Sequence, residues 1–152
     1  MLEILREKIP DVTFTTDIIV GFPGETEEMF LETCEFVRKC GFLYVHIFPY
    51  SDRAGTDASK MKNKLFDEEK KRRAAILKDV MLETRKKVLD GYMGSIRSVL
   101  VETVKDGIAS GHTDNFIEVK FDTGIQKNSL VSVRITGVSD DFEYAKGELC
   151  LD

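Results

Sequence analysis

The sequence predicts an α/β part followed by an all-β part, with one long helix between them. In residues 1–59, strand-like and helix-like segments alternate with short connections, which is typical of a βαβ unit in a parallel sheet. From Ser95 onward the apolar residues recur with a period near two, and turn residues separate five short segments, which favours a small closed β-barrel. We therefore expect three parts: residues 1–59, a linking helix over 60–92, and a barrel over 93–152.

The first part is expected to hold two strands and two helices. The run Ile18, Ile19 and Val20 is β-branched and apolar, as in strands that are covered on both faces. Thr26 is a good N-cap for the following helix, and Gly41 suits the C′ position that ends it. A parallel crossover of this kind should be right-handed. The expected elements are a helix over Leu2–Lys8 that Pro10 ends, a strand over Val12–Val20, the helix between Thr26 and Gly41, a strand over Phe42–Tyr50 and a polar loop over Ser51–Ser59.

The linking helix and the barrel strands follow from two different hydrophobic periods. Within the helix expected over Asp67–Leu89, Leu77, Met81, Thr84 and Val88 form one stripe at helical spacing. Beyond it the period near two predicts strands joined by turns. The expected barrel strands are Ile96–Val104, Gly107–Thr113, Phe116–Phe121, Leu130–Ile135 and Glu148–Leu151.

Composition places the chain among ordinary globular proteins. Its 152 residues are 42% hydrophobic and 32% charged. No apolar run approaches the roughly 20 residues that a membrane span needs. The amino terminus lacks the basic-then-apolar order of a signal peptide, so we expect a cytoplasmic protein without a membrane partner. The net charge is −5, but residues 60–90 hold 11 basic and 6 acidic side chains, so any polyanion must bind locally.

The three cysteines, Cys34, Cys40 and Cys150, have no CxxC or CxxxCxxC spacing. We expect free thiols that pack as small hydrophobic side chains. By itself, the chain is expected to ligate no metal or iron–sulfur cluster.

The segment Gly21–Thr26 (GFPGET) is the strongest candidate for a ligand contact. It places flexible backbone at the carboxyl end of a strand, where open α/β sheets bind their ligands. It lacks the lysine of GxxxxGK[ST] and the spacing of GxGxxG, which argues against a nucleoside triphosphate site. Two interpretations stay open, a structural strand-to-helix turn and a turn that contacts a ligand.

Two longer segments carry a resemblance to a known family. Asp17–Thr26 (DIIVGFPGET), followed by Phe48–Ala58 (FPYSDRAGTDA), resembles in order and separation two signatures of the radical S-adenosylmethionine (SAM) methylthiotransferases. The resemblance covers nearly all of the chain, and members of the family are about three times longer. It implies that residues 1–59 are the last strands of a radical-SAM partial TIM-type barrel. The cysteines that hold the clusters would then lie upstream, and the chain alone would be inactive.

The resemblance also implies where SAM would bind. In that family the first of these strands, with its turn, lies beside the adenosine part of SAM, and the second brings an aromatic strand and a polar loop to the barrel mouth. Arg53 suits a phosphate or carboxylate, although local pairing or solvent exposure explains it equally well. His46 is expected to face the barrel interior. The implied cofactor-binding residues are Ile19, Val20, Gly21, Phe22, Gly24, Tyr50, Ser51 and Arg53.

The second half resembles the TRAM domain of the same family, a five-stranded, OB-like barrel that binds RNA. The segment Ser110–Phe121 (SGHTDNFIEVKF) carries this resemblance. Its GHTDNF form, together with His46–Ser51 (HIFPYS), is most similar to the branch that acts on threonylcarbamoyladenosine in tRNA. Three open alternatives are that Phe116 is a core residue, that His112 is a turn residue, and that the helical row of cations is a solvated face. The candidate RNA contacts are Lys71, Lys78, Arg85, Arg97, His112, Asn115, Phe116 and Lys120.

Taken together, the resemblance implies a part of an enzyme that methylthiolates carbon 2 of N6-threonylcarbamoyladenosine at position 37 of tRNA. Its cofactors would be SAM and two 4Fe-4S clusters, one of which cleaves SAM to a 5′-deoxyadenosyl radical. Its partners would be a tRNA anticodon stem-loop and the N-terminal portion of the same polypeptide. The alternatives are the isopentenyladenosine branch, a stand-alone RNA-binding TRAM module and a SAM-binding regulator. Exposed sheet edges in the α/β part also invite dimerisation.

Overall fold

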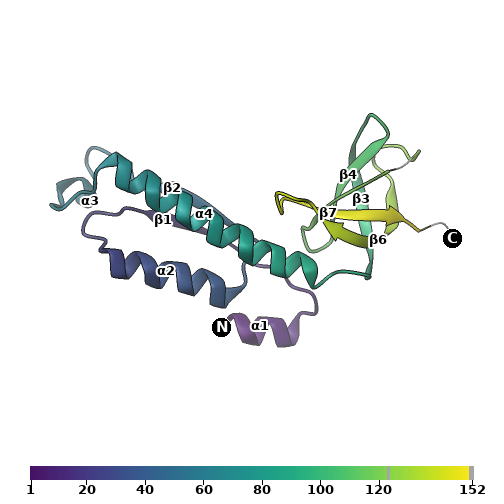
Figure 1. The fold of residues 1–152 in the computed structure, drawn as a ribbon, viewed down its shortest axis with the longest axis horizontal. Helices are drawn as coiled ribbons and strands as arrows, with labels where there is room; N and C mark the ends of the chain where they lie inside the picture. The colour runs from purple at the N-terminus through teal and green to yellow at the C-terminus, as the bar shows by residue number, and fades with distance from the viewer. Residues whose placement is uncertain (123, 151–152) are drawn as a thin grey trace. The chain divides into compact units, whose positions relative to one another are not determined.

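The computed structural model describes residues 1–122 and 124–150. Its contacts form two compact units (Figure 1): unit 1 holds Met1–Thr13 and the chain from Arg85 onward, and unit 2 holds Phe14–Thr84. The elements are α1 (Leu2–Lys8), β1 (Thr15–Val20), α2 (Glu27–Cys40), β2 (Tyr44–Pro49), α3 (Asp57–Lys60), α4 (Asp67–Asp90), β3 (Ile96–Lys105), β4 (Ile108–Thr113), β5 (Glu118–Asp122), β6 (Leu130–Val138) and β7 (Ala145–Leu149).

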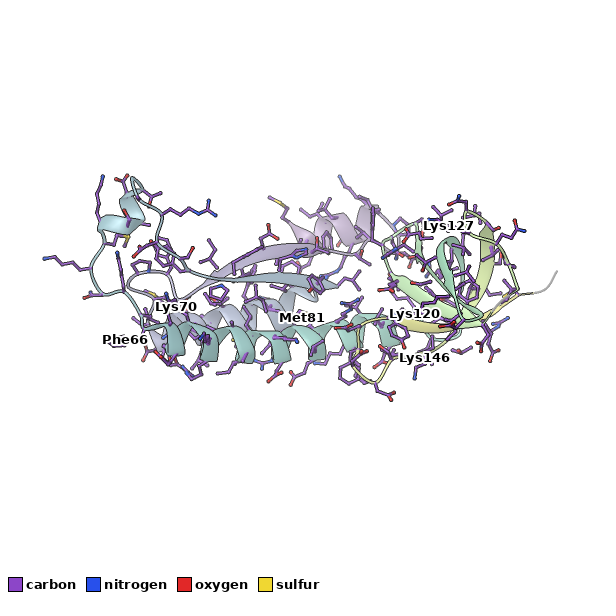
Figure 2. All side chains as sticks on the ribbon, turned by 90° about the horizontal axis from the view of Figure 1, so that it is seen from above. Phe66, Lys70, Met81, Lys120, Lys127 and Lys146 are labelled. Carbon is purple, nitrogen blue, oxygen red and sulfur yellow. The ribbon has the colours of Figure 1, made fainter. Side chains whose placement is uncertain are left out.

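Unit 2 is built on two parallel strands, as the alternation of segments predicted. β1 pairs with β2 in a register that runs from Thr15 opposite Tyr44 to Val20 opposite Pro49. Both α2 and α4 lie on one side of these strands (Figure 2). Their inward faces form the core of the unit because apolar residues recur at helical spacing along each helix. The buried side chains of the two helices include Phe30, Cys34, Val37, Leu77, Val80 and Met81.

The ends of α2 follow the capping signals in the sequence. The Thr26 hydroxyl accepts a hydrogen bond from the Met29 N–H at 3.3 Å, which confirms the N-cap. Gly41 has a φ of 61°, and its N–H donates to the Val37 carbonyl at 3.2 Å, which confirms the C′ glycine. A second threonine cap, Thr56, starts the short helix α3 inside the segment expected to be a loop.

Unit 1 contains a closed barrel with strand order β3-β4-β5-β7-β6. All neighbouring strands are antiparallel except β5 and β7. Alternation along each strand sends one set of side chains inward, and valine is the commonest of these, which suits the narrow interior. The fully buried side chains of the barrel strands include Val99, Val101, Val119, Val133 and Ile135. The five-stranded barrel predicted from the period of two is therefore confirmed.

Two barrel details depend on tertiary contacts. Gly111 lies so close to β3 that a Cβ there would be 1.9 Å from the Leu100 carbonyl oxygen, so only glycine fits. The register of β3 and β4 shifts between Val101 and Thr103, where β3 carries a bulge. β7 begins earlier than expected, at Ala145, and the end of the expected strand at Leu151 lies outside the described residues.

The cysteines are free thiols, and two of them pack in the core of unit 2. Cys34 is 2% exposed and Cys40 is 8% exposed, whereas Cys150 is partly exposed. Burial raises the pKa of the Cys34 thiol, so it stays protonated at neutral pH. No helix in residues 1–122 and 124–150 is both long and apolar enough to span a membrane.

Candidate functional site

The candidate small-molecule site is a cavity on the face of the β1–β2 sheet that α2 and α4 leave uncovered. Its volume is about 490 Å³. Ile19 and Phe48, which are register partners, form its apolar wall and are each at least half exposed. Asp17, which the sequence did not single out, adds a carboxylate beside them. The open face thus joins an apolar floor to a polar rim, which is the usual composition of a ligand site.

The rim of the cavity comes from the segment that follows β2. Tyr50, Ser51 and Arg53 all line it, together with Ile19. The Tyr50 hydroxyl donates to Asp52 at 2.9 Å. Among the described residues, no acidic group pairs with the Arg53 guanidinium. This cation is therefore available to an anionic group of a ligand.

The neighbouring strand residues do not share one surface. Val20 has no exposed surface and faces the core formed with the helices, because alternation along β1 turns it away from Ile19. Phe22 is 39% exposed and packs edge-on against the Tyr50 ring, at 5.3 Å between ring centroids. His46 lies on the open face of β2 and is exposed, with its ring against Tyr44 at 4.7 Å.

The Gly21–Gly24 turn has a backbone conformation that favours glycine, and the surrounding protein holds it in place. Gly21 has a φ of 72°, and a Cβ there would lie 2.3 Å from the Cγ atom of Lys70. Lys70 (labelled in Figure 2) lies across the turn and donates from Nζ to the Tyr50 carbonyl at 3.1 Å. Gly24 has a φ of 87°, and its N–H donates to the Asn63 carbonyl at 3.0 Å. Both glycines are therefore required by backbone conformation, and the turn is a structural element at the end of the strand beside the cavity.

A buried ionic cluster behind the turn was not foreseen from the sequence. The Arg73 side chain is 5% exposed and donates to the Glu25 carboxylate at 2.5 Å and to Glu69 at 2.7 Å. Glu25 in turn accepts from the Gly21 N–H at 2.8 Å. Burial lowers the pKa of Arg73, but its hydrogen bonds to the two carboxylates outweigh burial, and the pKa is raised. Hydrogen bonds from Arg72 and Arg73 hold the pKa of Glu69 at about 2.

The helical row of cations divides into residues with different surroundings. Lys71 and Lys78 are exposed on the part of α4 that belongs to unit 2. Arg85, in unit 1, donates from Nη2 to the Glu143 carbonyl and is only partly exposed. Of the row, Lys71 and Lys78 are thus the residues whose exposure suits a phosphate contact.

The second candidate surface is on the barrel, around Phe116. Phe116 is 77% exposed, so it is not a core residue. It lines a hollow together with Leu100, Leu130 and His112. His112 lies on β4 opposite Leu100, and its Nδ1 atom is 3.0 Å from Glu102. These side chains form an aromatic and apolar surface of the kind on which unpaired bases stack.

Two further predicted RNA contacts instead hold unit 1 together. The Asn115 side-chain amide donates to the Asp11 carbonyl at 2.7 Å and to the Tyr92 hydroxyl at 2.9 Å. Arg97 pairs with the Asp11 carboxylate at 2.7 Å and lies over the Tyr92 ring. The hydrogen bond from Arg97 is the main cause that lowers the pKa of Asp11. The sequence alone did not show these contacts because Asp11 is far away along the chain.

Lys120 occupies a separate part of the barrel. It lies over the Tyr144 ring at 3.9 Å and is 3.5 Å from Glu118. Its register partner on β7 is Lys146, which Figure 2 also labels. No residue that lines the hollow around Phe116 is therefore a register partner of Lys120.

Possible iron ligands do not gather in the described part of either unit. Among the described residues, no three His, Cys, Asp or Glu side chains gather as a metal site. The buried Cys34 and Cys40 lie within one helix, six positions apart, and so do not suit a 4Fe-4S cluster. The residues of the cavity on the β1–β2 face do fit an adenosine-containing molecule, because they combine apolar walls, hydroxyls and a free guanidinium.

These features define the class of the chain: a two-stranded parallel sheet with helices on one face and a ligand-sized cavity on the other, together with a closed five-stranded β-barrel. No family profile matches the chain. Individual proteins do match it. A tRNA-2-methylthio-N(6)-dimethylallyladenosine synthase of Acetivibrio thermocellus is 41% identical over 138 residues, which are 88% of this chain and 29% of that protein.

Two similar proteins carry the other substrate in their names. The threonylcarbamoyladenosine tRNA methylthiotransferase of Thermotoga maritima is 39% identical over 93% of this chain and 32% of its own length. A probable threonylcarbamoyladenosine tRNA methylthiotransferase of Methanocaldococcus jannaschii is 42% identical over 96% of this chain and 32% of its own length. The chain is therefore homologous to part of the tRNA methylthiotransferases, as its motifs predicted. It spans about a third of the length of these relatives.

Proposed function

We propose that this chain is part of a tRNA methylthiotransferase, in which unit 2 supplies part of the SAM site and unit 1 contacts the RNA. The observation that carries the proposal is the 39–42% identity, over 88–96% of the chain, to enzymes named for this reaction. The geometry supports it in two places. An open face of adenosine-compatible composition lies beside the end of β1, where the GFPGET turn begins, and an exposed aromatic surface lies on the barrel.

Within the SAM site, this chain would provide walls and polar contacts. Ile19 and Phe48 would pack against the adenine ring, Ser51 would hydrogen bond to the ribose, and Arg53 would pair with the carboxylate of the methionyl group. SAM supplies the methyl group in this reaction when it is bound. The iron–sulfur clusters would be held by cysteines outside these residues, on the N-terminal portion of the same polypeptide. The isolated chain is thus expected to form no methylthio product.

For the substrate, we propose N6-threonylcarbamoyladenosine at position 37 of the anticodon stem-loop, modified at carbon 2 in the cytoplasm. The support is the form of two segments, His46–Ser51 and Ser110–Phe121, which are most similar to that branch. Overall identity does not separate the branches, because relatives of both kinds match equally well. The isopentenyladenosine branch is therefore the alternative to be tested.

Nucleoside analysis of tRNA tests the proposal. The source gene is first read upstream of Met1 for an in-frame CxxxCxxC segment, and the whole protein is expressed in a strain that lacks both methylthiotransferase activities. We expect the 2-methylthio derivative of N6-threonylcarbamoyladenosine in hydrolysed tRNA. If the 2-methylthio derivative of isopentenyladenosine is found instead, the protein is assigned to the isopentenyladenosine branch. Absence of both products, with the protein folded and its clusters loaded, would refute the proposal.

A second candidate function, a stand-alone RNA-binding module, is favoured by one observation. The barrel of unit 1 is closed, so it does not depend on further strands. Unit 2 argues against it, because its two strands have few neighbours and expose Ile19 and Phe48. Open edges and an apolar face invite pairing with other chains. Concentration-dependent dimerisation of the isolated chain would agree with an incomplete sheet, and a strictly monomeric, cooperatively unfolding chain would favour the module.

A further inference from the structure

We propose that the outer surface of β3 and β6 is a platform for a short stretch of unpaired RNA, with a base stacked at one end and a phosphate paired at the other. This inference rests on the proposed function for the identity of the polymer. It adds which end of the site takes the base and which end takes the phosphate. It also adds a residue, Arg134, that sequence reasoning did not single out. The platform consists of Ile96, Ser98 and Leu100 on β3 and of Leu130, Ser132 and Arg134 on β6.

The strand register places these six side chains in three adjacent pairs. Leu100 lies opposite Leu130, Ser98 opposite Ser132, and Ile96 opposite Arg134. Residues two apart on a strand point to the same side, so all three pairs share the outer surface. All six residues are exposed, and Leu130 is 70% exposed. From the first pair to the last, the platform is about 13 Å long, which is the length of a few nucleotides.

Phe116 extends the apolar end of the platform and is presented rigidly. Its φ of 64° is unusual for an aromatic residue and costs free energy, so the surrounding loop must hold it in place. The Phe116 N–H donates to the Thr113 carbonyl at 3.1 Å, and the Ile117 N–H donates to the Thr113 hydroxyl at 3.0 Å. Asn115 anchors the same loop to Asp11. A pre-positioned aromatic ring loses little entropy when a base stacks on it.

Charge decides which part of a nucleotide binds at each end. Beside Phe116 and Leu100 the charged groups are Glu102 and Asp114, with His112 next to Glu102. These carboxylates repel a phosphate, so the apolar end takes a base.

The opposite end of the platform holds one cation, Arg134, whose register partner on β7 is the exposed Glu148. One N–H of the Arg134 guanidinium donates to the Gly94 carbonyl at 3.1 Å, which directs the side chain while other N–H groups of the fork remain for a phosphate. Between the two ends, Ser98 and Ser132 present hydroxyls where the sugars of the bound strand would lie.

A protein partner fits this surface less well. Protein-docking surfaces have a contiguous apolar centre with a polar rim. Here the centre is polar, because it consists of the two serines, and the apolar residues lie at the two ends. This is the reverse of an apolar centre with a polar rim. An alternation of ring, hydroxyls and cation matches the base, sugar and phosphate of a single strand.

Binding of a fluorescently labelled oligoadenylate to the 152-residue chain, followed by anisotropy at several salt concentrations, tests the platform. Phe116→Ala is expected to weaken binding about tenfold through the loss of one stacked base, with the salt dependence unchanged. Phe116→Tyr should restore the affinity. Arg134→Gln is expected to lower the slope of log affinity against log salt by about 0.7, the loss of one phosphate contact to a single strand.

Matched controls come from exposed residues at the far end of β3 and β4. Ile108→Ala removes an exposed apolar side chain, and Lys105→Gln removes an exposed cation. Both should leave affinity and salt slope unchanged. Equal binding by Phe116→Ala, Arg134→Gln and the unaltered chain would refute the platform, as would no binding by the unaltered chain. Either result leaves the proposed function to be judged by nucleoside analysis of the whole protein, which does not depend on this surface.

Discussion

Replacement of Arg73 by methionine probes the buried ionic cluster that secures the GFPGET turn. The guanidinium donates to Glu25 and Glu69, and it also donates to the main-chain carbonyl of Glu25 at 3.1 Å. Methionine keeps an unbranched apolar stem but removes every donor, together with the guanidinium that lies over the Phe30 ring. The Glu25 carboxylate, with its side chain 13% exposed, then keeps only the Gly21 N–H as a partner.

The expected cost follows from the uneven burial of the partners. Removal of one member of a buried ion pair costs about 3–5 kcal/mol, because the other charge stays desolvated. Glu69 is 32% exposed and regains water when Arg73 is lost, so only Glu25 pays the full penalty. We therefore expect a loss of about 3 kcal/mol in the free energy of unfolding of unit 2, the lower end of that range. This corresponds to about a hundredfold increase in the exchange rate of amides that open with the unit.

Hydrogen exchange followed by mass spectrometry measures this locally. Peptides from β1 and α2 should exchange about a hundredfold faster in Arg73→Met, while peptides from β3 and β4 serve as an internal reference and should not change. Arg72→Met is the matched control, since Arg72 pairs with Glu27 and Glu69 but is 44% exposed, and exposed pairs contribute less than about 1 kcal/mol. Similar exchange in both variants, or equal acceleration in both units, would refute the reasoning.

Three further predictions concern single contacts. Gly111→Ala should destabilise the barrel by about 3 kcal/mol, because its Cβ would overlap the Leu100 carbonyl; Gly124→Ala, where nothing lies within 4 Å, should have no effect in thermal melts. The folded pKa of Glu69 is about 2 against an ordinary 4.5, so its contribution to stability is present above pH 4.5 and lost as the pH falls towards 2; denaturant titrations of Glu69→Gln should lack that part of the acid dependence. Thr26→Ala should cost about 1 kcal/mol in unit 2, and Thr26→Ser should recover it; an unchanged midpoint for Thr26→Ala would contradict the cap.

The structure brings together only some of the residues that the motifs predicted as one site. Ile19, Tyr50, Ser51 and Arg53 line one cavity, although two different segments of the chain supply them. The glycines of the turn serve its backbone conformation and its contact with Lys70. Their place beside the cavity follows from the strand they end. The structure thus divides the residues predicted from the motifs between positions that line the cavity and positions that support the turn, and their contact with a ligand stays a prediction.

On the barrel, exposure separated residues that the sequence grouped together. Phe116 is exposed in a rigid loop, whereas its neighbour Asn115 is tied to Asp11 and Tyr92. Adjacent residues in a turn point in different directions, and no periodicity indicates which one reaches solvent. Arg134 was missed because a single cation in an alternating strand carries no motif, and its relation to Leu130 and Ser132 appears only in the register.

The local elements, the barrel of five strands and the family relationship could all be predicted from the amino-acid sequence. Hydrophobic period, capping threonines and turn glycines act over a few residues, so they can be read directly, as at Thr26 and Gly41. Which charges are buried and which faces are open depends on how the elements pack against one another. Arg73 looked like one more cation on a basic helix, yet it is enclosed by Glu25 and Glu69, because a salt bridge across many residues depends on how elements pack. Ile19 and Val20 are equally apolar, and only the packing of α2 and α4 against one face of the sheet buries Val20 and leaves Ile19 on the open side.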